Sequence, residues 1–406
     1  MKPLLFNTYA DKGGAAQAVS RIFTSIRQQL PESKLVIQQP ANKLPQGFLN
    51  ISNRKFNTIR PYLDFSIGAL RTFRRSTYFP AAVSSPHLYK CLEKEQPDII
   101  HFNWMQGGYF DFGTKTAIIK PLIWTFHDLW PITGGCSYPG TCKNYLTGCG
   151  NCPLFVFKSA ADLSQKAFAK RKAFFQSNNN IHIVTPSNWL KNTIIASPML
   201  KNTPISVIPN GIDTNQFFPY DKAISRKELG IETKKKIIVF GAIGATTNKI
   251  KGFDILLDAL KRLDSASILL IVFGATVKPN TENLETHYFP FINDAKWLNK
   301  LYSAADVMVI PSRQEVFGQT ALEAMAAATP VVAFDNSGPA DMVIHKENGF
   351  LANPFEPESL ADGIQWVLNQ PDITLGINAR NTVVEKFDIS LIADQYIHLY
   401  KKLFTT

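Results

Sequence analysis

The sequence predicts an α/β protein with two Rossmann-like domains, and three observations support this prediction. Short apolar runs that fit buried strands recur along the 406 residues, and several are followed by glycine and then by a helical pattern. Such alternation of strands and helices is typical of parallel sheets covered by helices. With 45% hydrophobic residues, a chain of this length has ample apolar material for two or three domain cores.

The segment 307–334 contains the most informative strand–helix–strand unit. Its first strand, 307–310, ends at Pro311, and the helix that starts at Gly318 stops before Pro330, where the next strand begins. The first turn of a helix has unpaired N–H groups and the positive end of the helix dipole, and Gly318 lets an anion approach the backbone closely. We therefore expect a phosphate group at this helix start.

Two carboxylates of this unit are spaced so that both can serve one ligand. Glu315 precedes the helix, and Glu323 lies about a turn and a half inside it. A carboxylate at the second position can accept hydrogen bonds from a ribose diol. The alternative is an ordinary strand–helix–strand unit with two surface glutamates.

The stretch 311–334, PSRQEVFGQTALEAMAAATPVVAF, resembles the E-x7-E segment of family-4 retaining glycosyltransferases of the GT-B fold, whose usual form is PSxxExFGxxxLEAMAxGxPVVA. The resemblance implies a nucleotide-diphospho-sugar as the donor substrate. It also implies that Glu315 and the backbone at Phe317 and Gly318 hold the sugar, and that Glu323 holds the ribose.

Glycine-rich turns after two further strands supply phosphate-loop positions. Gly13 and Gly14 follow the strand at 3–8, where glycines serve either a phosphate or only a tight turn. Lys249 and Lys251 precede a helical pattern, and a lysine beside a glycine loop supplies a mobile cation for a diphosphate. Both turns resemble donor-binding loops of the same family, in which Lys251 fits the phosphate-binding lysine.

Two positions depart from the family pattern. Ala245 stands where the family commonly has arginine, so the second cation is either Lys249 or missing. Ala328 stands where the family usually has glycine, which bears on packing more than on chemistry.

Two predicted strands end in polar residues that an open α/β sheet would deliver to a ligand. They are His101 and Asn103 in the segment 97–104, and His127 and Asp128 in the segment 121–130. The sequence HD followed by WPITGG resembles a subgroup of the same family in which the histidine points at the donor sugar, so we expect His127 in the site. For His101, a structural hydrogen bond is an equal alternative.

Four cysteines follow within seventeen residues, in a glycine-rich stretch that ends in CxxC: Cys136, Cys142, Cys149 and Cys152. In a chain without a recognisable signal peptide, this clustering favours a structural zinc site on the acceptor side over two disulfides or free thiols. Cys91 lies on another segment and is expected to be a core thiol.

Charge is distributed unevenly along the chain, whose net charge is +11. Residues 1–203 contain 24 lysines and arginines and 9 acidic residues, whereas the rest of the chain contains 19 lysines and arginines and 23 acidic residues. The N-terminal half therefore suits an acidic partner. The segment 54–79 interleaves basic with aromatic and aliphatic residues, which fits a helix at an anionic membrane surface or a core-facing helix with a solvated basic side. No sequence signature of a nucleic-acid-binding fold is present.

No stretch approaches the roughly 18–20 apolar residues of a membrane span, and the first residues contain only a short, interrupted apolar run. We therefore expect a cytoplasmic protein, in peripheral contact with the inner face of the cell membrane if the basic segment binds there. A break near residue 204 suggests two domains, 1–203 plus 386–406 on the acceptor side and 204–385 for the nucleotide sugar.

The resemblance implies two domains facing each other across a cleft and a retaining glycosyltransferase that uses a glycan or lipid-linked acceptor in cell-surface polysaccharide or lipopolysaccharide synthesis. His127, Lys251 and Glu315 are the expected catalytic residues, and no catalytic metal is needed because Lys251 and the helix start at Gly318 meet the charge of the leaving diphosphate. Alternatives are a GT-B nucleotide-sugar epimerase or hydrolase, and a non-catalytic membrane or nucleic-acid binding module.

Overall fold

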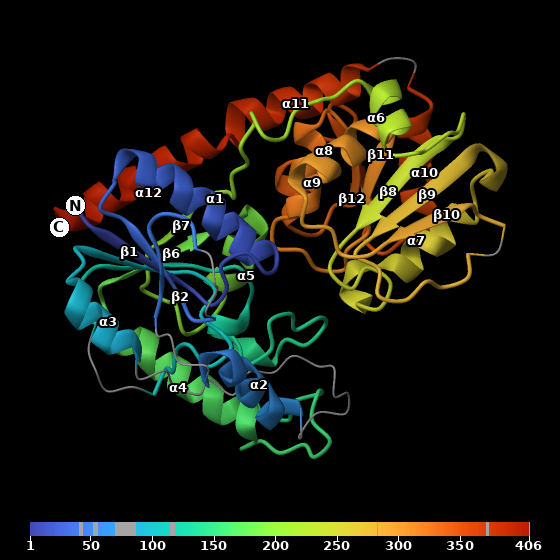
Figure 1. Cartoon of the computed structure of the whole chain (residues 1–406). Coiled ribbons are helices and arrows are strands. Elements are labelled where there is room, and N and C mark those ends of the chain that lie inside the picture. Colours follow the sequence, from blue (N-terminus) through green and yellow to red (C-terminus); the bar gives the residue numbers. More distant parts are fainter. Residues whose placement is uncertain are drawn as a thin grey trace. The chain divides into compact units, whose positions relative to one another are not determined.

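The computed structural model describes residues 1–39, 44–51, 56–69, 87–113, 118–281, 283–370 and 373–405. The chain forms two compact units (Figure 1): unit 1 consists of Met1–Pro209 with Ala393–Thr406, and unit 2 of Asn210–Ile392. The sequence placed the corresponding limits at 203/204 and 385/386.

Unit 1 is built on a seven-stranded parallel sheet in the order β3-β2-β1-β4-β5-β6-β7. Its strands are β1 (Pro3–Asn7), β2 (Lys34–Ile37), β3 (Phe48–Asn50), β4 (Ile99–Phe102), β5 (Leu122–Thr125), β6 (Ile181–Thr185) and β7 (Ile205–Val207). Its helices are α1 (Gly14–Gln29), α2 (Phe56–Ala69), α3 (His87–Glu95), α4 (Leu163–Ser177) and α5 (Asn188–Ile195). The order changes direction at β1 and β4, which is where an open α/β sheet presents its ligand site.

The two faces of this sheet are covered because adjacent residues of a strand point to opposite sides. In β5, Trp124 packs against Phe174 of α4, whereas Thr125 contacts Tyr396 of α12 (Ile389–Phe404). Figure 1 shows α1 and α12 on one side of the sheet and α3 and α4 on the other. The resulting cores are rich in aromatic rings, which contribute large buried areas.

Unit 2 has a six-stranded parallel sheet in the order β10-β9-β8-β11-β12-β13. Its strands are β8 (Lys236–Gly241), β9 (Ile268–Phe273), β10 (Thr286–Phe289), β11 (Val307–Ile310), β12 (Val331–Phe334) and β13 (Gly349–Ala352). Its helices are α6 (Lys222–Glu228), α7 (Phe253–Leu260), α8 (Ala295–Ala304), α9 (Gln319–Ala326), α10 (Pro357–Leu368) and α11 (Thr374–Lys386). Helices α8, α9 and α11 cover one face of this sheet, and α7 and α10 cover the other (Figure 1). Buried side chains of these helices form a core with the strands on each face.

The last helix, α12, begins in unit 2 and ends in unit 1. Its start is fixed by a bridge between Ile212 and Asp388, and its later turns bring Tyr396 and Tyr400 against His101 of β4. The later turns of this amphipathic helix, from Ala393 onward, thus belong to unit 1.

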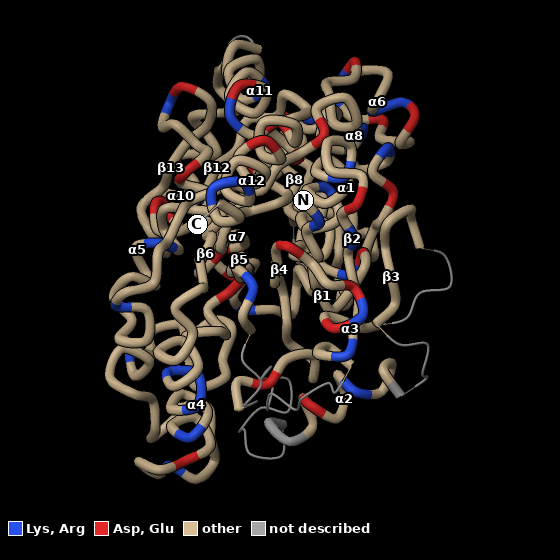
Figure 2. The backbone as a smooth tube through the Cα atoms, turned by 90° about the vertical axis from the view of Figure 1, so that its left-hand side faces the viewer, with Lys and Arg blue, Asp and Glu red and all other residues tan. Residues whose placement is uncertain are grey.

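Helix α4 carries four basic residues, Lys166, Lys170, Arg171 and Lys172, whose positions are blue in Figure 2. Of the basic and aromatic segment 54–79, the structure describes only the part within α2, in which Ile59, Tyr62 and Leu63 are exposed. The remaining basic residues of that segment, Arg54, Lys55, Arg71, Arg74 and Arg75, lie outside the described residues. Among the helices that the structure describes, none is long and apolar enough to cross a membrane.

Candidate donor-binding and acceptor-side sites

The predicted unit at 307–334 is present as β11, a loop, α9 and β12. Gly318 directly precedes α9 with φ of 97°, a backbone conformation that side-chain-bearing residues rarely adopt. A Cβ at this position would also lie 3.1 Å from Cγ of Pro339. The helix start therefore requires glycine, and its main-chain N–H groups can receive an anion.

Lys251 and Glu315 form an ion pair in which Nζ and Oε2 are 2.6 Å apart. Lys251 lies in the 3-10 turn η3 (Lys249–Lys251), and Glu315 lies in the loop between β11 and α9. Both side chains are largely buried, with 22% and 17% of their surfaces exposed, so solvent screens the pair only partly. The fold thus brings together two predicted site residues that are 64 positions apart in the sequence.

The η3 turn is held by Arg313, which the sequence reasoning did not identify. The Arg313 main-chain N–H donates to the carbonyl of Ile250 at 2.8 Å, and its Nη1 donates to the carbonyl of Lys249 at 2.6 Å. Its guanidinium also forms a two-pronged pair with Asp254 of α7, with both N–O distances at 2.8 Å. The arginine inside PSRQE was the available signal, but its partners could not be found from local sequence.

Lys249, the alternative cation, is exposed. Its carbonyl serves Arg313, whereas the neighbouring Lys251 is the lysine that meets Glu315. The Gly252 that follows has φ of 74°, and a Cβ there would come within 1.8 Å of the carbonyl oxygen of Pro311. Because glycine has no Cβ, η3 can lie this close to the end of β11.

Glu323 is 3% exposed and lies on the buried side of α9. One of its carboxylate oxygens accepts a hydrogen bond from the hydroxyl of Tyr302 on α8 at 3.0 Å. Tyr302 is a second residue that sequence reasoning missed, because it comes from a different helix. The alternative of two surface glutamates does not fit this burial.

Phe317 was predicted to contact the donor, and its side chain is 2% exposed in the core of unit 2, against Phe387. Its contribution to a ligand is therefore limited to the main chain. The same loop is braced by Gly338, whose N–H donates to the carbonyl of Glu315 at 2.8 Å. A Cβ on Gly338 would lie 2.1 Å from the carbonyl oxygen of Val316, so this approach also needs glycine.

In unit 1, the predicted glycine loop lies between β1 and α1. Gly13 precedes the helix with φ of 98°, and Gly14 is its first residue. A Cβ on Gly13 would meet no atom within 4 Å, so packing does not explain the glycine and the backbone conformation does.

His127 follows β5 and is half-buried. Its Nε2 lies 3.3 Å from Oδ1 of Asn103, a residue that follows β4. Burial lowers the pKa of His127 to about 4, so its imidazole is neutral at pH 7 and can donate or accept a hydrogen bond. The structure thus brings together the two polar residues predicted after neighbouring strands.

Asp128 forms hydrogen bonds with residues of the loops around it. Its carboxylate accepts hydrogen bonds from Nε1 of Trp104, Nε2 of Gln106 and the main-chain N–H of Trp130. Burial raises its pKa to about 6, and these donors oppose that shift because they favour the charged form. Asp128 therefore organises the main chain on either side of His127.

His101 is 1% exposed and lies within β4. Its Nδ1 is 2.6 Å from the hydroxyl of Tyr400, and its Nε2 is 2.8 Å from Oγ1 of Thr125. Burial lowers the pKa of His101 to about 3. These contacts support the structural reading of His101.

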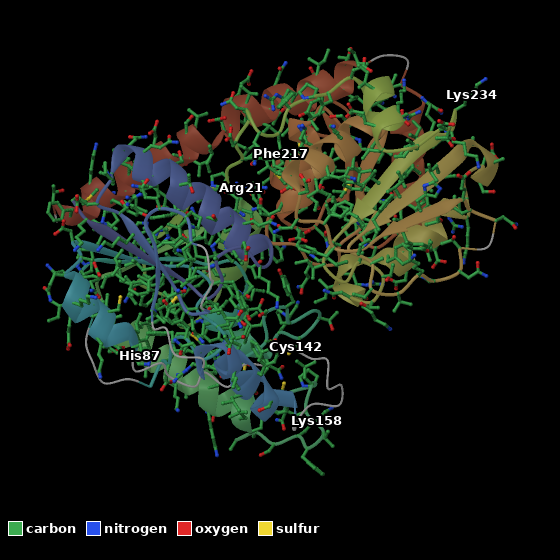
Figure 3. The ribbon with its side chains drawn as sticks, in the orientation of Figure 1. Arg21, His87, Cys142, Lys158, Phe217 and Lys234 are labelled. Carbon is green, nitrogen blue, oxygen red and sulfur yellow. The ribbon has the colours of Figure 1, made fainter. Side chains whose placement is uncertain are left out.

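The four cysteines of the predicted zinc site lie in the loop between β5 and α4, where Cys142 is labelled in Figure 3. All four, and Cys91, are present as thiols without a disulfide. Among the described residues, no three histidine, cysteine or acidic side chains are already spaced as the ligands of a metal ion. Zinc at this loop stays a prediction.

Two protein-family models match the chain. The model described as "Glycosyltransferase Family 4" matches residues 54–216, and the model described as "Glycosyl transferases group 1" matches residues 221–384. Each covers most of one unit.

Curated relatives include an uncharacterized glycosyltransferase of Methanocaldococcus jannaschii, which is 32% identical over 56% of this chain and 62% of its own length. A D-inositol 3-phosphate glycosyltransferase of Segniliparus rotundus is 33% identical over 41% of this chain and 40% of its own length. The capsular polysaccharide biosynthesis glycosyltransferase CapM of Staphylococcus aureus is 27% identical over 54% of this chain and 60% of its own length. The matches thus span 40 to 62% of these relatives.

Solved structures share the fold along the whole chain. Sucrose-phosphate synthase of Thermosynechococcus elongatus superimposes with a TM-score of 0.71 at 20% identity, covering 100% of both chains. HepE of Anabaena, solved in complex with UDP-glucose, gives a TM-score of 0.66 at 18% identity, covering 99% of this chain and 100% of that one.

Proposed function

Because the chain belongs to the family-4 glycosyltransferases of the GT-B fold, we propose that it transfers a sugar from a nucleotide-diphospho-sugar to a glycan or lipid-linked acceptor, with retention at the anomeric carbon. Unit 2 is the proposed donor-binding unit, and unit 1 is the proposed acceptor-side unit. The observation that carries this proposal is the Lys251–Glu315 pair beside the glycine-started helix α9.

The donor diphosphate takes the place of Glu315 beside Lys251. A diphosphate carries more negative charge than one carboxylate, so Lys251 interacts more strongly with the donor than with Glu315. The N–H groups at the start of α9 face the same anion in this proposal. Glu315, released from Lys251, accepts hydrogen bonds from sugar hydroxyls and is not assigned as a nucleophile.

In the transfer step, the bond between the anomeric carbon and the phosphate oxygen breaks, and a bond to the acceptor oxygen forms on the same face. The leaving phosphate gathers negative charge, which Lys251 and the α9 terminus stabilise. That phosphate oxygen takes the proton of the acceptor hydroxyl. Neutral His127, held near Asn103, is proposed as a further contact to the donor sugar.

Glu323 is the proposed ribose ligand, and Tyr302 holds its carboxylate in place. Gly13, Gly14 and the exposed Lys249 are proposed as further contacts to the donor. Similarity to CapM of Staphylococcus aureus and to the fold of WaaG, a glycosyltransferase involved in lipopolysaccharide biosynthesis, supports a role in cell-surface polysaccharide synthesis. The solved complex of HepE with UDP-glucose makes UDP-sugars the first donors to test.

The proposed place of action is the cytoplasmic face of the membrane, where lipid-linked acceptors are reached by peripheral contact. The charge excess of the N-terminal half supports this contact with an anionic surface. Binding to vesicles with and without anionic lipid checks it, and equal binding to both would argue against electrostatic contact.

The test is release of nucleoside diphosphate from a panel of UDP-, GDP- and ADP-sugars, with and without candidate acceptors and in the presence of EDTA in a short assay. We expect release that depends on acceptor and persists in EDTA, and a product anomer that matches the donor anomer by proton NMR. Turnover of donor alone would instead favour the nucleotide-sugar epimerase or hydrolase. Inversion, or EDTA inhibition that magnesium or manganese reverses, would contradict the mechanism.

A further inference from the structure

Arg171 is a buried cation whose guanidinium has no hydrogen-bond partner. It lies on α4, is 1% exposed, and its Nε and both Nη atoms make no hydrogen bond within the described residues. Its guanidinium carbon lies 5.0 Å from the ring centre of Phe112 and 4.9 Å from that of Trp130. These aromatic faces attract a cation, but they do not replace hydrogen bonds lost from water.

A buried charge of this kind requires an anion nearby. Burial lowers the pKa of Arg171 to about 10, and Cys136, Cys149, Asp64 and Asp128 lie near enough to oppose that shift when they are charged. Both cysteines belong to the loop that precedes α4. Neutral thiols carry no charge to offset the guanidinium, whereas thiolates bound to a metal do.

Main-chain N–H groups lie close to two sulfur atoms of this loop. Burial raises the pKa of the Cys149 thiol to about 11 and also raises that of Cys152, while the N–H groups of Gly134 (at Cys149) and of Leu154 and Phe155 (at Cys152) oppose these shifts because they favour the thiolate. Cys149 has φ of 59°, a left-handed conformation that turns the chain sharply within the CxxC segment. Main-chain donors to ligand atoms of this kind orient a metal's ligands.

The loop is tied to the helix that carries Arg171. A carboxylate oxygen of Asp162, which caps the start of α4, accepts from the main-chain N–H of Cys152 at 2.9 Å. Gly134 and Gly150 pack so closely that a Cβ on either would lie 2.4 Å from a carbonyl oxygen, of Ser164 and Ala160 respectively. The loop and the start of α4 are thereby held together through the main chain.

We propose that Cys136, Cys142, Cys149 and Cys152 bind one structural zinc ion, and that Arg171 is the buried counter-ion of this thiolate site. Four thiolates around Zn²⁺ carry a net charge of about −2, which one guanidinium offsets in part. Binding releases the thiol protons to solvent and draws the four sulfur atoms to about 2.3 Å from the metal. No position remains open for a substrate, so the ion stabilises the loop rather than taking part in the transfer.

Metal analysis of the full chain, purified without a histidine tag, tests the site independently of any activity. We expect about one zinc per chain and, among the five cysteines, four thiols that react with a thiol reagent only after the zinc is removed. The Cys91→Ser variant is the matched control and keeps its zinc, because Cys91 lies on α3. The Cys142→Ser variant loses most of it.

The role of Arg171 is tested by zinc competition against a chromogenic chelator. We expect Arg171→Met to bind zinc about tenfold or more weakly than the wild type, because the partners of metal ligands contribute on the order of 10–100-fold to affinity. The zinc affinity of Arg171→Lys should lie between those of the wild type and Arg171→Met. If Arg171→Met does not fold, Arg171→Lys still reports the effect. Zinc below one tenth of an equivalent, with four reactive thiols or with two disulfides, would overturn the site. Unchanged affinity in the folded arginine variants would overturn the counter-ion.

Discussion

At the scale of single residues, the donor site depends on which partner each charge has. Lys251 and Glu315 neutralise each other at 2.6 Å, and both are shielded from most of the solvent. In the proposed complex, a phosphate group of the ligand replaces Glu315 as the ion-pair partner of Lys251. The carboxylate of Glu315 is then able to accept hydrogen bonds from sugar hydroxyls. Glu323 differs from Glu315 because it is almost fully buried and already accepts a hydrogen bond from the hydroxyl of Tyr302.

Lys251→Ala removes the cation that we propose stabilises the leaving diphosphate. We expect kcat to fall about 100-fold with a smaller change in donor KM, since the interaction is strongest in the transition state. Steady-state kinetics with the preferred donor measure both constants. The control is Lys261→Ala, which removes an exposed lysine that pairs with Asp258 at the end of α7. We expect this variant to retain wild-type kinetics. Wild-type kcat in Lys251→Ala would remove this residue from the mechanism.

Glu323→Ala removes the proposed acceptor of the ribose hydroxyls. We expect donor KM to rise about tenfold or more, because hydrogen bonds to a charged group contribute about 1.5–3 kcal/mol each. Tyr302→Phe keeps the carboxylate and removes only the hydroxyl that holds it, so its KM should rise less. If Glu323→Ala folds normally and keeps the wild-type KM, the ribose lies elsewhere.

At the scale of elements, the site depends on how η3 and the β11–α9 loop are held together. Arg313 binds two carbonyls of η3 and the carboxylate of Asp254, and Gly252 permits the close approach to Pro311. Lys251 belongs to this turn, so its position opposite Glu315 depends on contacts that it does not itself make.

Arg313→Ala should loosen η3 and displace Lys251 without removing any proposed ligand. We expect kcat/KM for the donor to fall about tenfold, because small displacements of a positioned group are costly in catalysis. Arg262→Ala is the matched control, since Arg262 forms an ion pair with Glu358 at an exposed position of unit 2. Equal kinetics in the two variants would show that Arg313 has no positioning role.

The strand 307–310 was predicted with its observed bounds, and the next strand was predicted to follow Pro330, because apolar runs and flanking prolines are local signals. The helix start at Gly318 was predictable for the same reason. Ala328 was expected to matter for packing, yet it has φ of 59°, which explains on backbone grounds why glycine is usual there. The partners of Glu315 and Glu323 could not be predicted, because they come from other elements and leave no local pattern.

At the scale of the whole molecule, the chain leaves unit 1 near Pro209 and returns to it through α12. The returning helix is attached to the sheet by buried polar contacts, in which His101 joins Tyr400 to Thr125. A neutral histidine suits this position, since burial lowers the pKa of His101 to about 3.

Acid should therefore weaken unit 1 through His101. Between pH 6.5 and pH 3 the unfolded chain binds a proton that folded His101 does not, so the free energy of unfolding falls as pH falls, by about 2 kcal/mol at pH 5. Asp128, whose pKa is raised to about 6, acts in the opposite direction in the wild type and in the variants alike.

Urea unfolding at pH 7 and pH 5 isolates this contribution. The His101→Gln variant should lose less stability on acidification than the wild type does. The His398→Gln variant, which changes an exposed histidine of α12, should behave as the wild type. An equal loss in all three proteins would rule out His101 as the source.

The central claim is that unit 2 binds a nucleotide-diphospho-sugar through Lys251 and the start of α9. Calorimetric titration of UDP-, GDP- and ADP-sugars into the wild type, Lys251→Ala, Gly318→Val and the control Lys261→Ala tests it most directly. The account predicts that at least one nucleotide sugar binds the wild type and Lys261→Ala equally well, and that it binds the other two variants at least about tenfold more weakly. Absence of binding by every nucleotide sugar, or equal affinity in all four proteins, would contradict it.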